Sequence, residues 1–106
     1  MVMRIKLMPD YGCYPIWGVD EIGNIAPEKL PLKADTISRL NAWAKLFDDG
    51  LDWSDPGGES LWSEEDAQLF EQEGINLWHQ LRRELSPKYE VYFSSRLIKH
   101  PDELNA

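Results

Sequence analysis

The side chains with the greatest capacity for chemistry are one cysteine, two histidines and a large excess of carboxylates. Cys13 is the only thiol, and His79 and His100 carry the only imidazoles. A cysteine nucleophile needs a nearby base and a lowered pKa, and the spacing of these residues supplies neither. One thiol and two isolated imidazoles also fall short of a zinc-ligand set. We therefore predict no catalytic residue, no metal and no cofactor.

The segment around Cys13 nevertheless concentrates aromatic side chains. Tyr11, Tyr14 and Trp17 lie close to Cys13 in the sequence, and Asp10 precedes them. Together they could line the aromatic pocket of a small enzyme or ligand-binding domain, which we keep as an alternative. A buried structural thiol is the simpler interpretation of Cys13. Thiol labelling of the folded chain distinguishes the two, because an inert Cys13 is no candidate nucleophile.

The strongest signal is an acidic segment that runs from Asp48 to Glu73. It holds ten of the 19 acidic residues, and no Lys or Arg occurs between Leu46 and Leu81. Two of the five tryptophans also lie in it. The acids are Asp48, Asp49, Asp52, Asp55, Glu59, Glu64, Glu65, Asp66, Glu71 and Glu73, and the tryptophans are Trp53 and Trp62.

The twelve residues from Asp48 to Glu59 invite comparison with a calcium-binding EF-hand loop. Asp48, Asp52 and Glu59 fit the first, fifth and twelfth positions of that loop. However, Trp53 stands where the turn requires glycine, and Gly50 stands where the third position needs an oxygen ligand. The pattern therefore does not predict a calcium site.

We predict instead that the acidic segment is a protein-binding surface. Carboxylates steer the approach of a basic partner, and large aromatic rings supply the buried contacts that hold it. The alternative is a solvated loop and helix start, with both tryptophans folded into the core. The predicted partner-binding residues are Asp52, Trp53, Asp55, Glu59, Trp62 and Glu64.

The overall composition narrows the possible partners and surroundings. The chain has 106 residues and a net charge of −8, so we expect one domain that repels the phosphates of nucleic acid. No apolar run reaches the roughly 20 residues needed to span a bilayer. The N-terminal residues lack the apolar core of a signal peptide, and a single cysteine cannot form an internal disulfide. We expect a cytoplasmic protein, and the oligomeric state stays open.

Hydrophobic periodicity predicts the elements that position these residues. Apolar and basic side chains alternate from Met3, as in a half-buried strand. Two later stretches show helical spacing; Gly50 suits the end of the first, and Ser63 suits the N-cap of the second. The predicted elements are a strand at 3–8, an ordered loop with one short strand (Ile16–Val19) at 9–33, a helix at 34–49, an acidic loop at 50–63, a helix at 64–85, a strand at 89–93 and a tail at 94–106.

This order predicts an α+β fold. A helical hairpin would pack on a small sheet of two or three strands that contains both the N-terminal and the C-terminal strand. Gly74 falls on the apolar face of the second helix, where glycine costs about 1 kcal/mol relative to alanine. We therefore expect close packing at Gly74 against the first helix or the sheet.

Residues 4–17 read Arg-Ile-Lys-Leu-Met-Pro-Asp-Tyr-Gly-Cys-Tyr-Pro-Ile-Trp. They resemble a family of small, poorly characterised bacterial proteins in which a strand runs into Asp-Tyr-Gly-Cys-x-Pro-Leu/Ile-Trp. The resemblance continues through Leu30-Pro31-Leu32, the helix with Trp43, and Asp55-Pro56. It implies a bacterial, cytoplasmic origin and transfers no chemistry.

The chain is also similar in kind to bacterial immunity proteins, which are small acidic inhibitors that occupy a basic surface of a toxic nuclease. That likeness lies in size and charge, and no residue role follows from it. Our first hypothesis is therefore an immunity-type inhibitor with a basic protein partner. The alternatives are the enzyme or ligand-binding domain described above and a non-catalytic subunit of a larger assembly.

Overall fold

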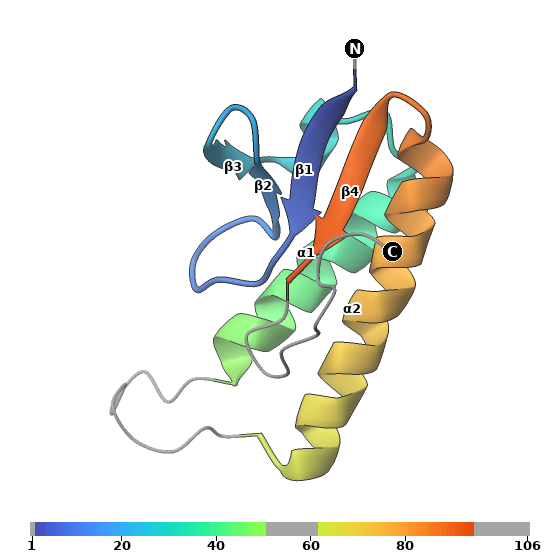
Figure 1. The fold of residues 1–106 in the computed structure, drawn as a ribbon. Coiled ribbons are helices and arrows are strands. Elements are labelled where there is room, and N and C mark those ends of the chain that lie inside the picture. Colours follow the sequence, from blue (N-terminus) through green and yellow to red (C-terminus); the bar gives the residue numbers. More distant parts are fainter. Residues whose placement is uncertain (1, 51–61, 95–106) are drawn as a thin grey trace.

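The computed structural model describes residues 2–50 and 62–94 of the chain. Four strands form one sheet in the order β3-β2-β1-β4, and two long helices follow one another as a hairpin (Figure 1). The elements are β1 (Met3–Leu7), β2 (Ile16–Gly18), β3 (Gly23–Ile25), a short 3-10 helix η1 (Pro27–Lys29), α1 (Ala34–Asp49), α2 (Glu64–Leu85) and β4 (Tyr89–Phe93).

The sheet is mixed, because β1 pairs antiparallel with β2 and parallel with β4. The predicted α+β class is confirmed, and both terminal strands lie in the sheet as expected. The predicted strand number is wrong, because β3 adds a fourth strand by pairing antiparallel with β2. The sequence of β3 is Gly-Asn-Ile, which has too little apolar alternation to reveal a strand.

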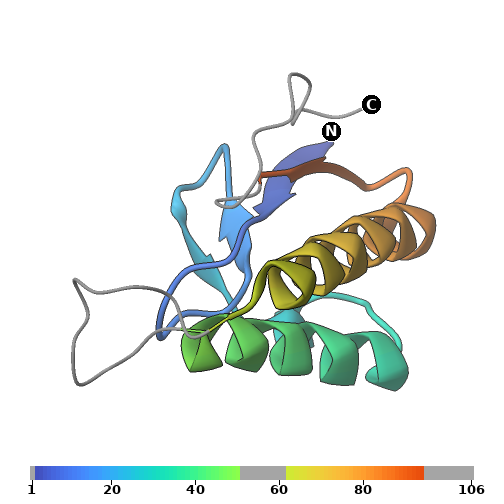
Figure 2. The ribbon, with the colours of Figure 1, turned by 90° about the horizontal axis from the view of Figure 1, so that it is seen from below.

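Both helices pack on one face of the sheet, as Figure 2 shows from below. Nearly all of the core side chains lie between these two layers, and α1 and α2 each contribute one apolar face. The most buried apolar side chains are those of Ile5, Leu7, Ile16, Leu40, Trp43, Phe47, Phe70, Leu77, Leu81, Leu85, Val91 and Phe93. Among the described residues, neither helix is apolar enough over its length to cross a membrane.

Gly74 marks the closest approach between these layers. A Cβ atom on Gly74 would lie 2.7 Å from Cζ2 of Trp43 on α1 and 3.1 Å from Cζ of Phe93 on β4. The expected close packing is therefore present, and it involves the first helix and the sheet together. The indole N–H of Trp43 donates to the carbonyl of Phe70 at 2.9 Å, which ties α1 to α2 beside this contact.

Glu84 near the end of α2 caps the start of α1. The backbone N–H of Lys33, the N-cap residue, donates to Glu84 Oε1 at 2.8 Å, and the Thr36 hydroxyl donates to Oε2. Lys33 has no side-chain cap of its own, so the carboxylate takes that role. Burial raises the pKa of the Glu84 carboxyl, but hydrogen bonds from Lys33, Thr36 and Gln80 outweigh it and hold that pKa below its usual value.

Trp78 covers the outer side of β4. The Lys88 carbonyl accepts from the Met3 N–H, and the Ser94 N–H donates to the Leu7 carbonyl. The main-chain groups of the even-numbered residues of β4 therefore point toward β1, and those of odd-numbered residues such as Val91 point away from it. The indole N–H of Trp78 donates to the Val91 carbonyl at 2.8 Å, and its ring stacks on Phe93 with centroids 5.8 Å apart.

We predict that Gly74→Ala lowers the free energy of unfolding by about 1–3 kcal/mol, although alanine is the better helix former. The added methyl group has no room between Trp43 and Phe93. Urea unfolding measures the effect. Gly23→Ala is the matched control, because a Cβ atom there meets nothing within 4 Å. Equal stability of Gly74→Ala and wild type would contradict the packing argument.

Glu84 predicts a pH dependence of stability. Because the Glu84 pKa is lowered in the folded state, its contribution to stability is complete above the ordinary pKa of a Glu carboxyl and is lost as pH falls through the lower folded pKa. Glu84→Gln should reduce stability at pH 7 and flatten its decline below that pH. Urea unfolding between pH 7 and pH 3 tests this, with the exposed Glu28→Gln as control. Parallel pH profiles for wild type and Glu84→Gln would show that the cap contributes nothing.

Candidate functional site at the open end of the helical hairpin

The open end of the helical hairpin, residues 46–50 of α1 and its C-cap together with residues 62–73, carries the described part of the acidic segment. Of the predicted partner-binding residues, Trp62 and Glu64 lie here. The others, Asp52, Trp53, Asp55 and Glu59, lie outside the described residues, as does most of the twelve-residue stretch compared with an EF-hand loop.

A capping box fixes the start of α2. The backbone N–H of Asp66 donates to the Ser63 hydroxyl, and the backbone N–H of Ser63 donates to the Asp66 carboxylate, both at 3.1 Å. Glu64, Glu65 and Asp66 are exposed in this first turn. Carboxylates at the positive end of a helix are favourable, so the local negative charge is built into a stable element.

An aromatic cluster closes the hairpin beneath these carboxylates. The Trp62 ring lies 4.7 Å from the Phe70 ring and 6.3 Å from the Phe47 ring, measured between centroids. Trp43 stacks on the same Phe70 at 4.5 Å. Trp62 is half-buried, so part of the ring belongs to the core and part stays accessible.

Gly50 follows α1 as its C-cap residue, in agreement with the predicted helix end, but with a right-handed φ of −76°. Conformational freedom is therefore not the reason for glycine here. A Cβ atom on Gly50 would lie 2.5 Å from Cε2 of Trp62 and 2.6 Å from its Nε1. The missing side chain makes room for the indole ring, which brings α1 and the start of α2 together.

The loop from Asp10 to Pro15 is fastened to this end of the hairpin. The Gly12 N–H donates to the Asp48 carboxylate at 2.9 Å, and Gly12 has a φ of +69°, which suits glycine. The Tyr11 ring stacks on Phe47 with centroids 4.3 Å apart, while the Tyr11 N–H donates to Asp10. These contacts make the loop a structural neighbour of the acidic segment.

The other residues proposed to line the alternative aromatic pocket contact different parts of the chain. The indole N–H of Trp17 donates to the Met8 carbonyl at 3.1 Å, beside the end of β1. Tyr14 binds the Asn24 side chain through its backbone and keeps an exposed ring, and Cys13 is half-buried. Tyr11 and Trp17 thus pack in different places, Tyr11 against α1 and Trp17 beside the sheet.

The acids of the segment differ in their surroundings. Glu73 binds Arg39 across the two helices at 3.1 Å, and Asp49 binds Lys45 within α1 at 3.1 Å. Glu71 is only 5% exposed, so it belongs to the interior rather than to the surface. In residues 2–50 and 62–94, no group of three His, Cys, Asp or Glu side chains is placed to hold a metal ion.

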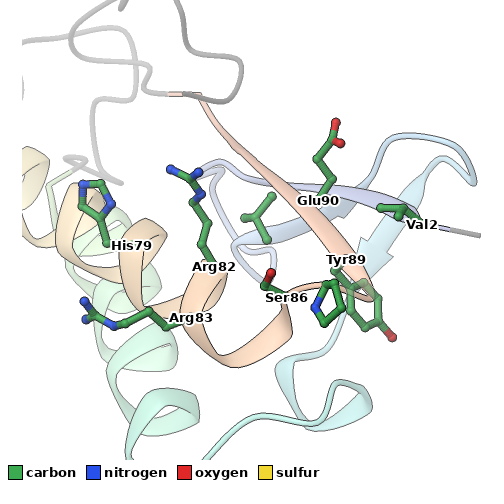
Figure 3. A pocket seen from close by; sticks show the side chains of 9 residues that line it. Val2, His79, Arg82, Arg83, Ser86, Tyr89 and Glu90 are labelled. Atoms are coloured by element: carbon green, nitrogen blue, oxygen red, sulfur yellow. The ribbon is translucent and has the colours of Figure 1, made fainter.

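A cavity of about 660 Å³ lies at the opposite end of α2 (Figure 3). His79, Arg82 and Arg83 contribute to its lining, together with Tyr89 and residues beside it. The two guanidinium groups point in different directions in Figure 3. Arg82 lies over the Trp78 ring at 5.3 Å, and Arg83 donates to Gln80 at 2.7 Å. The two guanidinium groups therefore do not converge on one point of the cavity.

The sequence model of the family described as Serratia CdiI immunity protein-like matches residues 3–96. The matched range begins with β1 and includes every described helix and strand. No curated protein matches the chain.

We predict that Gly50 and Trp62 are energetically coupled. Gly50→Ala should lower the free energy of unfolding by about 1–3 kcal/mol in the wild-type chain, because the methyl group displaces the indole ring. The same substitution should cost much less in a Trp62→Ala background, which leaves space at that position. Urea unfolding of the four proteins measures the coupling. Additive effects of Gly50→Ala and Trp62→Ala would show that the contact does not set the geometry of this end.

Proposed function

The chain belongs to the Serratia CdiI immunity protein-like family, and from this we propose that it is a non-catalytic inhibitor that binds a basic toxin in the cytoplasm. Membership of an immunity-protein family implies a cognate toxin as the partner. The negative charge of the chain, and its concentration between Asp48 and Glu73, supports a basic toxin surface.

The observation that carries this proposal is the acidic first turn of α2. Glu64, Glu65 and Asp66 are exposed together, and the structure gives Glu64 and Glu65 no salt-bridge partner among the described residues. The negative charge of these two carboxylates is therefore not neutralised by a described residue of the chain and can attract a cationic group of a partner. The field raises the association rate with a basic protein and repels acidic ones.

Trp53 and Trp62 are the proposed aromatic contacts, with Asp52, Asp55, Glu59 and Glu64 as the surrounding charges. Trp62 is held by Phe47 and Phe70, so its accessible edge is pre-positioned and loses little freedom on binding. Trp53 is assigned from the sequence, as the second large ring in the acidic segment. Inhibition then follows from occupying the toxin surface, and it requires no bond-making step by this chain.

The test uses, as the candidate toxin domain, the product of the open reading frame adjacent to the chain's gene. We expect the purified chain to bind that domain and to suppress its activity at a one-to-one ratio. The double variant Glu64→Gln/Glu65→Gln should slow association several-fold at low salt and flatten the dependence of the rate on ionic strength. Stopped-flow or biolayer interferometry at several salt concentrations measures both effects.

The matched control is Glu21→Gln/Glu28→Gln, which changes the net charge by the same amount at two exposed acids outside the acidic segment. This control should associate almost as fast as wild type. If both double variants slowed association equally, the net charge of the chain, rather than the acids at this end of the hairpin, would determine the association rate. Absence of binding by the wild-type chain would refute the proposed function itself.

A further inference from the structure

Two leucines are exposed at the open end of the hairpin. Leu69 on α2 is 62% exposed and Leu46 on α1 is 49% exposed. Each precedes a buried aromatic residue, Phe70 and Phe47 respectively, but points about 100° away from it around the helix axis and so lies outside the core. Neither leucine belongs to the buried core.

The Arg39–Glu73 ion pair shows how these leucines are placed relative to one another. It joins α1 to α2 and therefore marks the sides of the two helices that face each other. Leu46 follows Arg39 by seven residues, or two turns, and Leu69 precedes Glu73 by four residues, or one turn. Because the helices run in opposite directions (Figure 1), both leucines lie on the same seam, between the ion pair and the open end.

Carboxylates lie along this apolar seam, and two of them are paired with cations, Glu73 with Arg39 and Asp49 with Lys45. Residues three or four positions apart are neighbours on a helix surface, so Leu69 lies beside Glu65, Asp66 and Glu73. By the same spacing, Leu46 lies beside Asp49. The seam is thus an apolar strip of two leucines with the exposed carboxylates of Glu65 and Asp66 on its α2 side.

We propose that the Leu46–Leu69 seam is part of the toxin-binding surface and receives an apolar side chain of the toxin that is flanked by Lys or Arg. The inference rests on the proposed function and extends its contact surface from the acidic loop onto the two helices. Charge complementarity selects this occupant, because the exposed carboxylates of Glu65 and Asp66 beside Leu69 disfavour an acidic partner. The leucines supply the desolvated centre, and the carboxylates supply the rim, as in protein interfaces generally.

The test replaces each leucine by glutamine, which keeps helix propensity and length but removes the apolar surface. Leu69→Gln should weaken binding to the candidate toxin domain by about tenfold. The double variant Leu46→Gln/Leu69→Gln should weaken this binding more than either single change. The loss should appear mainly in the dissociation rate. Leu69→Met, which stays apolar, should bind within about twofold of wild type. Biolayer interferometry measures the rates, and thermal melts should agree with wild type within a few degrees.

Ile22→Gln is the matched control, because Ile22 is the most exposed large aliphatic residue of the described chain, at 92%, and lies in the β2–β3 turn. It should bind as tightly as wild type. Equal affinity of Leu69→Gln and wild type would overturn the inference while leaving the proposed function intact. So would a wild-type homodimer, detected by light scattering, that Leu69→Gln dissociates. A wild-type chain that does not bind the toxin removes the proposed function and this inference together.

Discussion

Gly74 lies against the rings of both Trp43 and Phe93, so α1, α2 and β4 meet at this position, and the packing of the hairpin on the sheet depends on it. A residue larger than glycine at this position would hold the helix away from both rings. Trp43 also stacks on Phe70 and donates to its carbonyl, so the same side chain positions the aromatic cluster at the open end. Phe47 and Trp62 pack on the same Phe70 ring and so continue this packing toward the open end.

Helix α2 carries opposite charges at its two ends. Glu64, Glu65 and Asp66 occupy its first turn, and Arg82 and Arg83 occupy its last. This order complements the helix dipole, so it stabilises the helix whatever the chain binds. The electrostatic field along α2 is therefore asymmetric: a basic protein would be attracted to the open end of the hairpin and repelled from the opposite end of the helix. The arrangement that stabilises the helix is thus also the one that the proposed basic partner would require.

The helices could be predicted from the sequence because apolar spacing, Ser63 and Gly50 all indicate the same boundaries. The α+β class followed, as did the close approach at Gly74. Strand β3 could not be predicted, since three residues with one apolar side chain carry no periodicity. The role of Glu84 was hidden because its partners, Lys33 and Thr36, lie about fifty residues away in sequence. The half-burial of Trp62 likewise depends on Phe47 and Phe70, which local sequence does not place.

The Trp78 contact with the Val91 carbonyl limits how a partner can approach the sheet. β4 is an edge strand, and an open edge invites pairing with another chain through the main chain. The indole N–H already occupies the acceptor at the middle of β4. An added strand would have to displace that ring from Phe93 before it could form a continuous ladder. Strand addition and edge-to-edge aggregation are therefore disfavoured on this side of the sheet.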